Sequence, residues 1–401
     1  MFKERIKGHP TPRLMQRMSS FDELKEFLNN NSSDDDGCIY FHVPYCDNIC
    51  SFCAMNRTKL DSELDDYLEF LLSEIEFYKN TKYFKDKPIK SIYFGGGTPT
   101  VFKKEHLKRL LSTINESFNL SKDIEYSFES TLHNLSIDKL LLMQELGVNR
   151  YSFGVQSFNS NARKFLNRVG DFDYAFKRLS EIKEHFKGTL CCDIIYNYPN
   201  QSIDEVLNDA KMVNEVGIDS VSFYSLIYFD KSELAKSIDK DYYDLNVDKS
   251  LHDAFLNAML DYKYKILEHT KLVKNDEYRY IRMTHNAKDI LPIGVGAGGN
   301  IANFGIFNMN KNMKMVSYKS LRMKEFVKFY NLFQYKKIDL NLALSYLSDE
   351  CKNEFQDFIT TCKNAGYIDE LDGFLEFSID GIFYANSISN EIINICKKDF
   401  N

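Results

Sequence analysis

The chain has 401 residues, of which 44% are hydrophobic, enough for one large core and a smaller second one. Its formal net charge is −7 with acidic and basic residues interspersed, so the composition does not indicate a nucleic-acid partner. The sequence lacks an apolar run near the roughly 18 residues that a membrane span needs, and MFKERIKGHP lacks the apolar region of a signal peptide. We therefore expect a cytoplasmic protein without a membrane span.

The cysteine count indicates reduced thiols. Nine cysteines in a long chain without a signal sequence do not fit a secreted disulfide scaffold. Six of them stand mostly among apolar residues and are expected to be small core side chains: Cys38, Cys191, Cys192, Cys351, Cys362 and Cys396. The other three fall within one short stretch and need a separate explanation.

Residues 1–37 are expected to form an N-terminal arm. The arm holds a short amphipathic stretch, FDELKEFL, and ends in the polar run NNNSSDDDG, which is typical of a linker. We expect the main body to begin at residue 38.

A strand–loop–helix pattern repeats from 38 to 230. Helices are predicted at 61–79, 104–117 and 136–146, and six strands at 38–43, 89–94, 124–129, 150–155, 189–196 and 221–226. This alternation indicates parallel βαβ units with right-handed crossovers. The predicted fold is α/β, a partial (β/α)6 barrel of the TIM type, with a doubly wound open sheet as the alternative.

The position of the unusual residues favours the barrel. Cysteines 46–53, glycines 95–97, Glu129, Gln156 and Asp193 all lie at or just beyond the ends of successive predicted strands. Barrel enzymes place their sites at the carboxyl ends of the strands.

Two further regions follow the predicted barrel. Residues 231–318 are expected to extend the barrel and cover the substrate, with a polar helical part at 229–275 and a glycine-rich strand and turn at 289–307. Residues 319–401 are expected to form a C-terminal α+β domain of the winged-helix type. It would have helices near 320–334, 341–347, 351–365 and 382–397 and a hairpin at 366–379. The acidic balance favours a packing role over DNA binding for this domain.

The stretch Tyr40–Asn56, YFHVPYCDNICSFCAMN, carries the three remaining cysteines in a C-x3-C-x2-C spacing. A closed zinc site needs four ligands. A four-iron cluster with three thiolates leaves one iron open to an outside ligand. The alternatives are three small buried residues, or a zinc site completed by His42 or a distant cysteine.

Two other motifs suggest a ligand pocket. GGGTPT, at 95–100, follows a predicted strand, and its glycines would let backbone N–H groups face an anionic or carbonyl group, although a tight turn also needs glycine. The motif is neither a Walker loop nor a dinucleotide fingerprint. Glu129, Gln156, Arg168 and Asp193 could hold an amino group, ribose hydroxyls and a carboxylate, or they could be ordinary rim residues.

Together the motifs resemble a known family. YFHVPYCDNICSFC, FGGGTPT, YSFEST, YSFGVQSF, DIIYNYPNQS and VSFYSL are similar, in order and spacing, to those of the radical S-adenosylmethionine (SAM) enzymes of the oxygen-independent coproporphyrinogen oxidase superfamily. The resemblance is dense over 38–230 and looser beyond. It implies a 4Fe–4S cluster whose open iron binds SAM, and reductive cleavage of SAM to a 5′-deoxyadenosyl radical.

The resemblance also implies residue roles. Cys46, Cys50 and Cys53 would ligate the cluster, and Tyr40 and Phe52 would lie beside it. The SAM contacts would come from Gly96, Gly97, Thr98, Glu129, Gln156, Arg168 and Asp193.

Departures from the superfamily pattern point to one branch. The cysteine that coproporphyrinogen oxidases carry soon after the third ligand is replaced here by Ala54, Met55 and Asn56, and the H-N-x-x-Y-W signature of the haem chaperones is reduced to His285 and Asn286. The short arm with HPTPR and the ending PIGVGAGG resemble the anaerobic haem-utilisation branch of the ChuW and HutW type. That branch implies a methyltransferase that opens the haem ring, with chaperone and oxidase as alternatives.

Within this hypothesis haem would lie over the barrel mouth. Arg13, Arg279 or Arg282 would attract its propionates, unless the last two are solvated in a polar loop. Tyr224, His285 and Arg282 are the candidate catalytic residues that would supply a proton or hydrogen atom. The resemblance further implies a low-potential electron donor such as flavodoxin.

Overall fold

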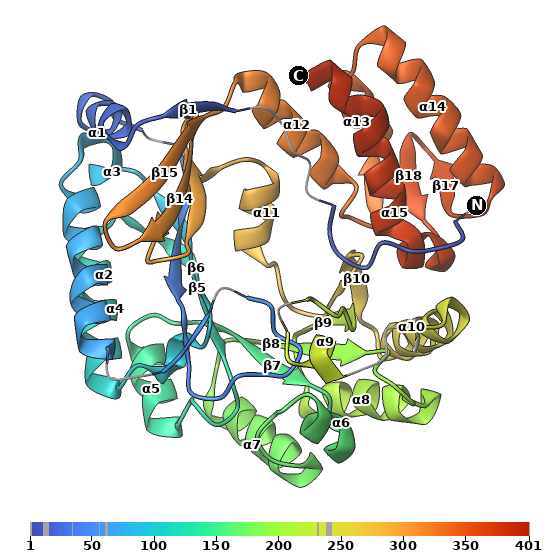
Figure 1. The fold of residues 1–401 in the computed structure, drawn as a ribbon, viewed down its shortest axis with the longest axis horizontal. Helices are drawn as coiled ribbons and strands as arrows, with labels where there is room; N and C mark the ends of the chain where they lie inside the picture. The colour runs from blue at the N-terminus through green and yellow to red at the C-terminus, as the bar shows by residue number, and fades with distance from the viewer. Residues whose placement is uncertain are drawn as a thin grey trace.

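The computed structural model describes residues 2–10, 16–33, 35–55, 57–60, 63–230, 232–237 and 243–400. A 13-stranded sheet runs in the order β1-β15-β14-β13-β12-β2-β5-β6-β7-β8-β9-β11-β10. The sheet curves, and most of the helices lie on its outer side (Figure 1). Its two end strands, β1 and β10, are not hydrogen-bonded to each other, so the barrel is partial, as the sequence predicts.

The six predicted strands are neighbours in the middle of this sheet and all pair in parallel. They are β2 (Gly37–Val43), β5 (Ile89–Gly96), β6 (Leu120–Ser130), β7 (Arg150–Gln156), β8 (Thr189–Tyr196) and β9 (Ser220–Ser225). The predicted strands and the α/β class are therefore confirmed. Their carboxyl ends meet at one edge, where the candidate residues cluster.

Amphipathic helices cover the outer face of the parallel strands. In α2, for example, Leu68, Leu71 and Ile75 are buried against the core. Ser202 begins α8 with a capping box, its side chain and that of Glu205 each bonding to the other's backbone N–H. The helices between the strands are α2 (Leu64–Lys79), α3 (Lys82–Lys85), α4 (Lys104–Ser117), α5 (Ile137–Glu145), α6 (Ser160–Phe165), α7 (Phe172–His185) and α8 (Ile203–Val216).

The sheet continues beyond β2 as an extension. β12 (Asp289–Ile293) pairs with β2 in parallel, and β13 (Gly298–Ile301), β14 (Phe304–Asn310), β15 (Met313–Tyr318) and β1 (Arg17–Ser19) follow in antiparallel order. Helix α1 (Phe21–Asn30) packs on this extension, with the rings of Phe27 and Phe304 5.3 Å apart. The segment predicted as one glycine-rich strand and turn therefore contributes to three strands.

The prediction of a helical segment over 229–275 is partly wrong. Helices α9 (Leu234–Ser237) and α10 (Leu245–Asp261) are present, but β10 (Lys265–Glu268) and β11 (Lys271–Val273) form a hairpin that pairs with β9. Lys263, with φ +70°, has a left-handed backbone conformation that does not continue helix α10. Strand β11 of the hairpin then pairs with the edge of β9 through backbone hydrogen bonds. Arg279 and Arg282, expected in a polar loop, lie in helix α11 (Arg279–His285).

The last eighty residues match the predicted helices and hairpin. Helices α12 (Leu321–Leu332), α13 (Leu340–Ser345), α14 (Asp349–Asn364) and α15 (Ile379–Cys396) surround a sheet in the order β16-β18-β17, with β16 (Lys337–Asp339), β17 (Ile368–Leu371) and β18 (Phe374–Phe377). The winged-helix likeness and the domain boundaries remain predictions.

Two expectations from composition can be compared with the structure. The six cysteines outside the loop are all buried and unpaired, as predicted. In the part of the chain that the structure describes, none of the helices combines the length and apolarity that crossing a membrane would require.

Candidate functional site

The three loop cysteines line one cavity. The loop follows β2 and is fixed by a short parallel pair, β3 (Tyr45–Cys46) with β4 (Thr58–Lys59). Cys46 is buried, and Cys50 and Cys53 are partly buried. All three line a cavity of about 200 Å³ at the carboxyl ends of the parallel strands. The sequence motif is thus folded into a pocket.

The donor set fits a cluster of several metal ions better than a single ion. Among the described residues, no three His, Cys, Asp or Glu side chains converge on one ion. In a four-iron cluster each thiolate binds a different iron, so three thiols spread around a cavity fit that group. The His42 ring packs where a side chain at Gly96 would stand. Among the described residues His42 forms no metal-binding group with the loop cysteines, so the structure does not support the zinc alternative with His42.

Polar groups contact the thiols. Nη1 of Arg168 lies 2.8 Å from Sγ of Cys50, and Oγ1 of Thr98 lies 3.6 Å from Sγ of Cys46. Burial raises the pKa of Cys46 to about 11, so this thiol stays protonated until a cation binds it. Arg168 also donates to the backbone oxygen of Gly154, which holds the guanidinium at the cavity wall.

Glu129 lies at the end of β6 and is partly buried. Burial raises the pKa of its carboxyl to about 7, although two hydrogen bonds oppose the shift. The hydroxyl of Tyr93 donates to Oε1 at 2.9 Å, and the N–H of Gly96 donates to Oε2 at 3.1 Å. A carboxyl with this pKa can hold an ammonium group as its partner when ionised.

The glycine motif acts differently from the prediction. The N–H groups of Gly97 and Thr98 donate to the carbonyl oxygens of Val43 and Tyr45, at 2.7 and 2.8 Å. A Cβ at Gly97 would lie 2.6 Å from the Tyr45 oxygen, so glycine is needed for the cysteine loop to approach β5. The N–H groups of this motif therefore bind the protein itself, while Gly96, Gly97 and Thr98 still line the cavity.

Two polar atoms at the cavity have no described partner. Oε1 of Gln156 and Nε of Arg168 are buried without a hydrogen bond in the described structure. Gln156 also has φ +71°, an unusual backbone conformation for a residue with a side chain. Buried polar atoms normally have partners, so these two are suited to a polar ligand. Asp193 lines the same cavity, and burial raises its pKa.

A second, larger cavity adjoins the first. Its volume is about 690 Å³, and it shares Phe52, Cys53, Met55, Gln156 and Asp193 with the smaller one. Its wall is mostly apolar and is completed by Lys7, Gly8, His9, Ala54, Ile195, Tyr224, Ser225, Leu226, Ile227 and Phe229. The arm residues 7–9 were not predicted, because nothing in the local sequence shows that they reach the barrel mouth.

The structure separates the three candidate catalytic residues. Tyr224 lines the larger cavity. Arg282 and His285 lie in α11 and line neither cavity. Nδ1 of His285 is 3.0 Å from the Tyr335 hydroxyl, and burial lowers its pKa to about 4, so the ring is neutral. Arg13 lies outside the described residues.

Of the two aromatic residues expected beside the cluster, Phe52 lines both cavities. Tyr40 points elsewhere: its ring stacks on Tyr280 and Tyr93, and its hydroxyl lies 3.0 Å from Nδ1 of His42. Tyr40 is linked to the cavity through the His42 ring, which packs on Gly96, and through Tyr93, which donates to Glu129.

Comparison with known proteins shows what this chain is similar to. Residues 40–213 match the model of the Radical SAM superfamily. The chain is 26% identical to an anaerobilin synthase of Escherichia coli O157:H7 over 290 residues, 71% of this chain and 65% of that protein, slightly under two thirds of its length.

Other relatives carry different names. A haem chaperone, HemW, of Buchnera aphidicola is 27% identical over 376 residues, 87% of this chain and 96% of the chaperone. An oxygen-independent coproporphyrinogen III oxidase of Salmonella typhimurium is 31% identical, over 47% of this chain and 41% of that enzyme. The solved coproporphyrinogen III oxidase HemN of Escherichia coli has the same fold, with a TM-score of 0.79, 18% identity and 96% of each chain covered.

Proposed function

We propose that this chain, whose residues 40–213 match the model of the Radical SAM superfamily, is a radical SAM C-methyltransferase that opens the haem macrocycle without oxygen, releasing iron and a linear tetrapyrrole. The observation that carries the proposal is the apolar cavity of about 690 Å³ that opens directly onto the cysteine loop. A ligand pocket of this size and lining suits a flat apolar ring. The likeness to an anaerobilin synthase supports the same substrate class.

The residues present fit the cofactors that this reaction needs. Cys46, Cys50 and Cys53 would hold a 4Fe–4S cluster, and Arg168 would neutralise charge beside Cys50. Glu129, Gln156 and Asp193 would hold the polar groups of SAM. When bound, these cofactors supply a one-electron route to a carbon radical, fed by a low-potential donor such as flavodoxin.

The chain's own residues would bind, orient and protonate the substrate. Leu226, Ile195 and Phe229 would contact the macrocycle and exclude water from the reacting carbon. Tyr224 lines the same cavity and is the candidate proton donor for the opened ring. Lys7, at the cavity wall, would attract a propionate.

A haem chaperone is the second candidate. This candidate is supported by the similarity to the haem chaperone HemW of Buchnera aphidicola, 96% of which is covered by the match. A chaperone would use the same apolar cavity to hold haem without changing it, since one scaffold can support both functions.

Anaerobic incubation of the cluster-loaded protein with haem, SAM and a low-potential reductant separates the candidates. We expect loss of the Soret band together with iron release. Haem that stays bound and intact would contradict the proposal and support the chaperone, and decarboxylation of coproporphyrinogen would support the oxidase instead.

Substitution of the cysteines tests the cluster. Cys50→Ala should abolish iron loading and SAM cleavage, because it removes a ligand at the cavity. Cys362→Ala, in the core of the C-terminal domain, is the matched control and should keep both. A fully active Cys50→Ala protein would contradict the assignment.

A further inference from the structure

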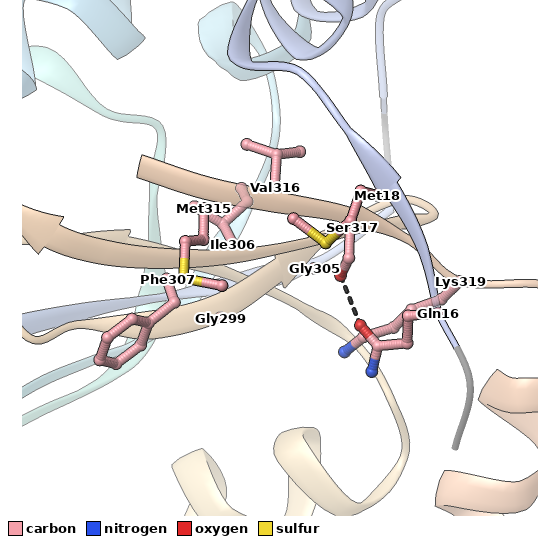
Figure 2. Close-up of a pocket in the computed structure, with 10 residues that line it drawn as sticks. All are labelled: Gln16, Met18, Gly299, Gly305, Ile306, Phe307, Met315, Val316, Ser317 and Lys319. Carbon is pink, nitrogen blue, oxygen red and sulfur yellow. Dashed lines mark hydrogen bonds between the residues drawn. The ribbon is translucent and has the colours of Figure 1, made fainter. Parts of the chain in front are cut away.

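The sheet extension carries a hollow that shares no residue with the two cavities of the candidate site. Its volume is about 280 Å³. It is lined by Gln16, Met18, Gly299, Gly305, Ile306, Phe307, Met315, Val316, Ser317 and Lys319, from β1, β13, β14, β15 and their flanks (Figure 2).

One end of the hollow is apolar and open to solvent. Phe307 pairs across the strands with Met315, and Met18 pairs with Ser317, so these side chains share one face. Exposed fractions are 63% for Met18, 45% for Met315 and 41% for Phe307. A large exposed apolar face of this kind marks a contact surface more often than a bare monomer surface.

The strand register shows on which side of the sheet the face formed by Met18, Phe307 and Met315 lies. The opposite face of β14 and β15 presents Ile306 and Val316 to the main core, beneath the outer helices. The register therefore places the Met18–Phe307–Met315 face on the inner side of the sheet, the side on which Tyr40 also lies.

The other end of the hollow is polar and cationic. The Lys319 side chain folds over Gly305: its Nζ would lie 3.5 Å from a Cβ placed there, and Cε 2.9 Å. Gln16 and Ser317 stand beside it, hydrogen-bonded to each other (Figure 2). Glycine at 305 thus leaves the room that the ammonium group occupies.

Lys319 has no carboxylate to balance it within the described structure. Burial lowers its pKa, and the charge next to it is that of another lysine, Lys324, which lowers it further. Residues 11–15, which precede Gln16, contain no Asp or Glu. A partly buried, unbalanced cation favours an anionic ligand.

We propose that this hollow is a second binding site for a tetrapyrrole, in which Met18, Phe307 and Met315 contact one edge of the macrocycle and Lys319 binds a propionate. This inference rests on the proposed function for its substrate class. A flat apolar ring with a carboxylate arm matches both ends of the hollow, and thioethers make favourable contacts with aromatic faces. The site would hold substrate before, or product after, it occupies the larger cavity.

Haem titration of the cluster-loaded protein, anaerobically and without reductant, tests the site through the Soret band. We expect two equivalents per chain. Lys319→Glu and Phe307→Ser should each reduce this to one, whereas Lys311→Glu, an exposed lysine on the same β14–β15 hairpin, should keep two. Haem dimethyl ester, whose propionates are capped, should bind the wild type and Lys319→Gln equally at the hollow.

One equivalent in the wild type, or two equivalents in both Lys319→Glu and Phe307→Ser, would overturn the inference. Because the titration lacks reductant, it does not depend on turnover. Two bound equivalents with no Soret loss in the complete reaction would contradict only the proposed function. Haem degradation with a titration that Lys319→Glu leaves unchanged would contradict only the second site.

Discussion

At the scale of single residues, Glu129 shows how the fold tunes one carboxyl. The side chain is partly buried and so tends to be neutral, yet it accepts hydrogen bonds from Tyr93 and Gly96 that favour the charged form. The balance leaves its pKa at about 7. A small change in pH therefore changes the charge that this residue offers to a ligand.

This pKa predicts pH-dependent binding of SAM. Above pH 7 Glu129 is ionised and can pair with an ammonium group, and below it the proton competes. The dissociation constant for SAM should fall about tenfold between pH 6 and pH 8. Calorimetric titration of the cluster-loaded protein measures it. Glu129→Gln should bind weakly and lose this pH dependence, and a flat profile in the wild type would contradict the role.

At the scale of elements, the segment between β11 and α11 closes the barrel end opposite the cavities. Asp276 accepts two hydrogen bonds from Arg150, at 3.1 and 2.9 Å, and one from Ser220, so it ties the first residues of β7 and β9 together. Burial alone would raise the pKa of Asp276, but Arg150 lowers it below the ordinary range. The side chains of Arg150 and Asp276 are each 2% exposed.

Breaking this pair should destabilise the barrel. Asp276→Asn leaves the Arg150 guanidinium buried without its counter-charge, at a cost of about 3 kcal/mol in the free energy of unfolding. Since the pKa of Asp276 is depressed, its contribution is present above about pH 4 and lost as pH falls further. Urea unfolding at pH 7 measures it. Glu69→Gln, in the exposed pair with Arg109, is the control and should leave the midpoint unchanged; an equal loss there would contradict the argument.

Local patterns in the sequence predict the parallel strands and their helices, and tertiary contacts decide the rest. The run CIYFHV and the cysteine spacing are visible in the chain alone. The start of helix α11 cannot be predicted from the local sequence. Its first N–H groups, of Arg279 and Tyr280, donate to Glu125 on β6, which is more than 150 positions away in the chain. Likewise, Lys263, two residues after the end of α10, is left-handed although it is not glycine, so the sequence carries no glycine that would predict the end of this helix.

At the scale of the whole molecule, residues 2–7 join the C-terminal helices to the residues around the larger cavity (Figure 1). Phe2 stacks on Tyr367 and Tyr384, with ring centroids 5.9 and 5.6 Å away. The N–H of Ile6 donates to Ser387 at 2.9 Å, and Nζ of Lys7 donates to the Leu226 oxygen at 3.1 Å. The wall of the larger cavity therefore depends on contacts made far from it in sequence.

Arg5 is the residue on which this docking depends. Its Nε lies 3.5 Å from Oδ2 of Asp248, a carboxylate that is fully buried, and its guanidinium lies 4.1 Å from the centre of the Phe383 ring. Arg5→Met would leave Asp248 with the Tyr243 hydroxyl but without its ion pair, which costs about 3 kcal/mol. The arm would then detach more often and take Lys7 and His9 away from the larger cavity.

We expect Arg5→Met to weaken haem binding at the larger cavity about tenfold and to make the chain sensitive to a lysine-specific protease at Lys7. Cleavage of SAM without haem should be unchanged, because none of the residues that line the smaller cavity comes from the arm. Lys3→Met is the matched control, since Lys3 lies on the same arm with its side chain exposed. Wild-type haem affinity together with protease resistance at Lys7 in Arg5→Met would show that the arm is held by other contacts, and that the cavity wall does not need this ion pair.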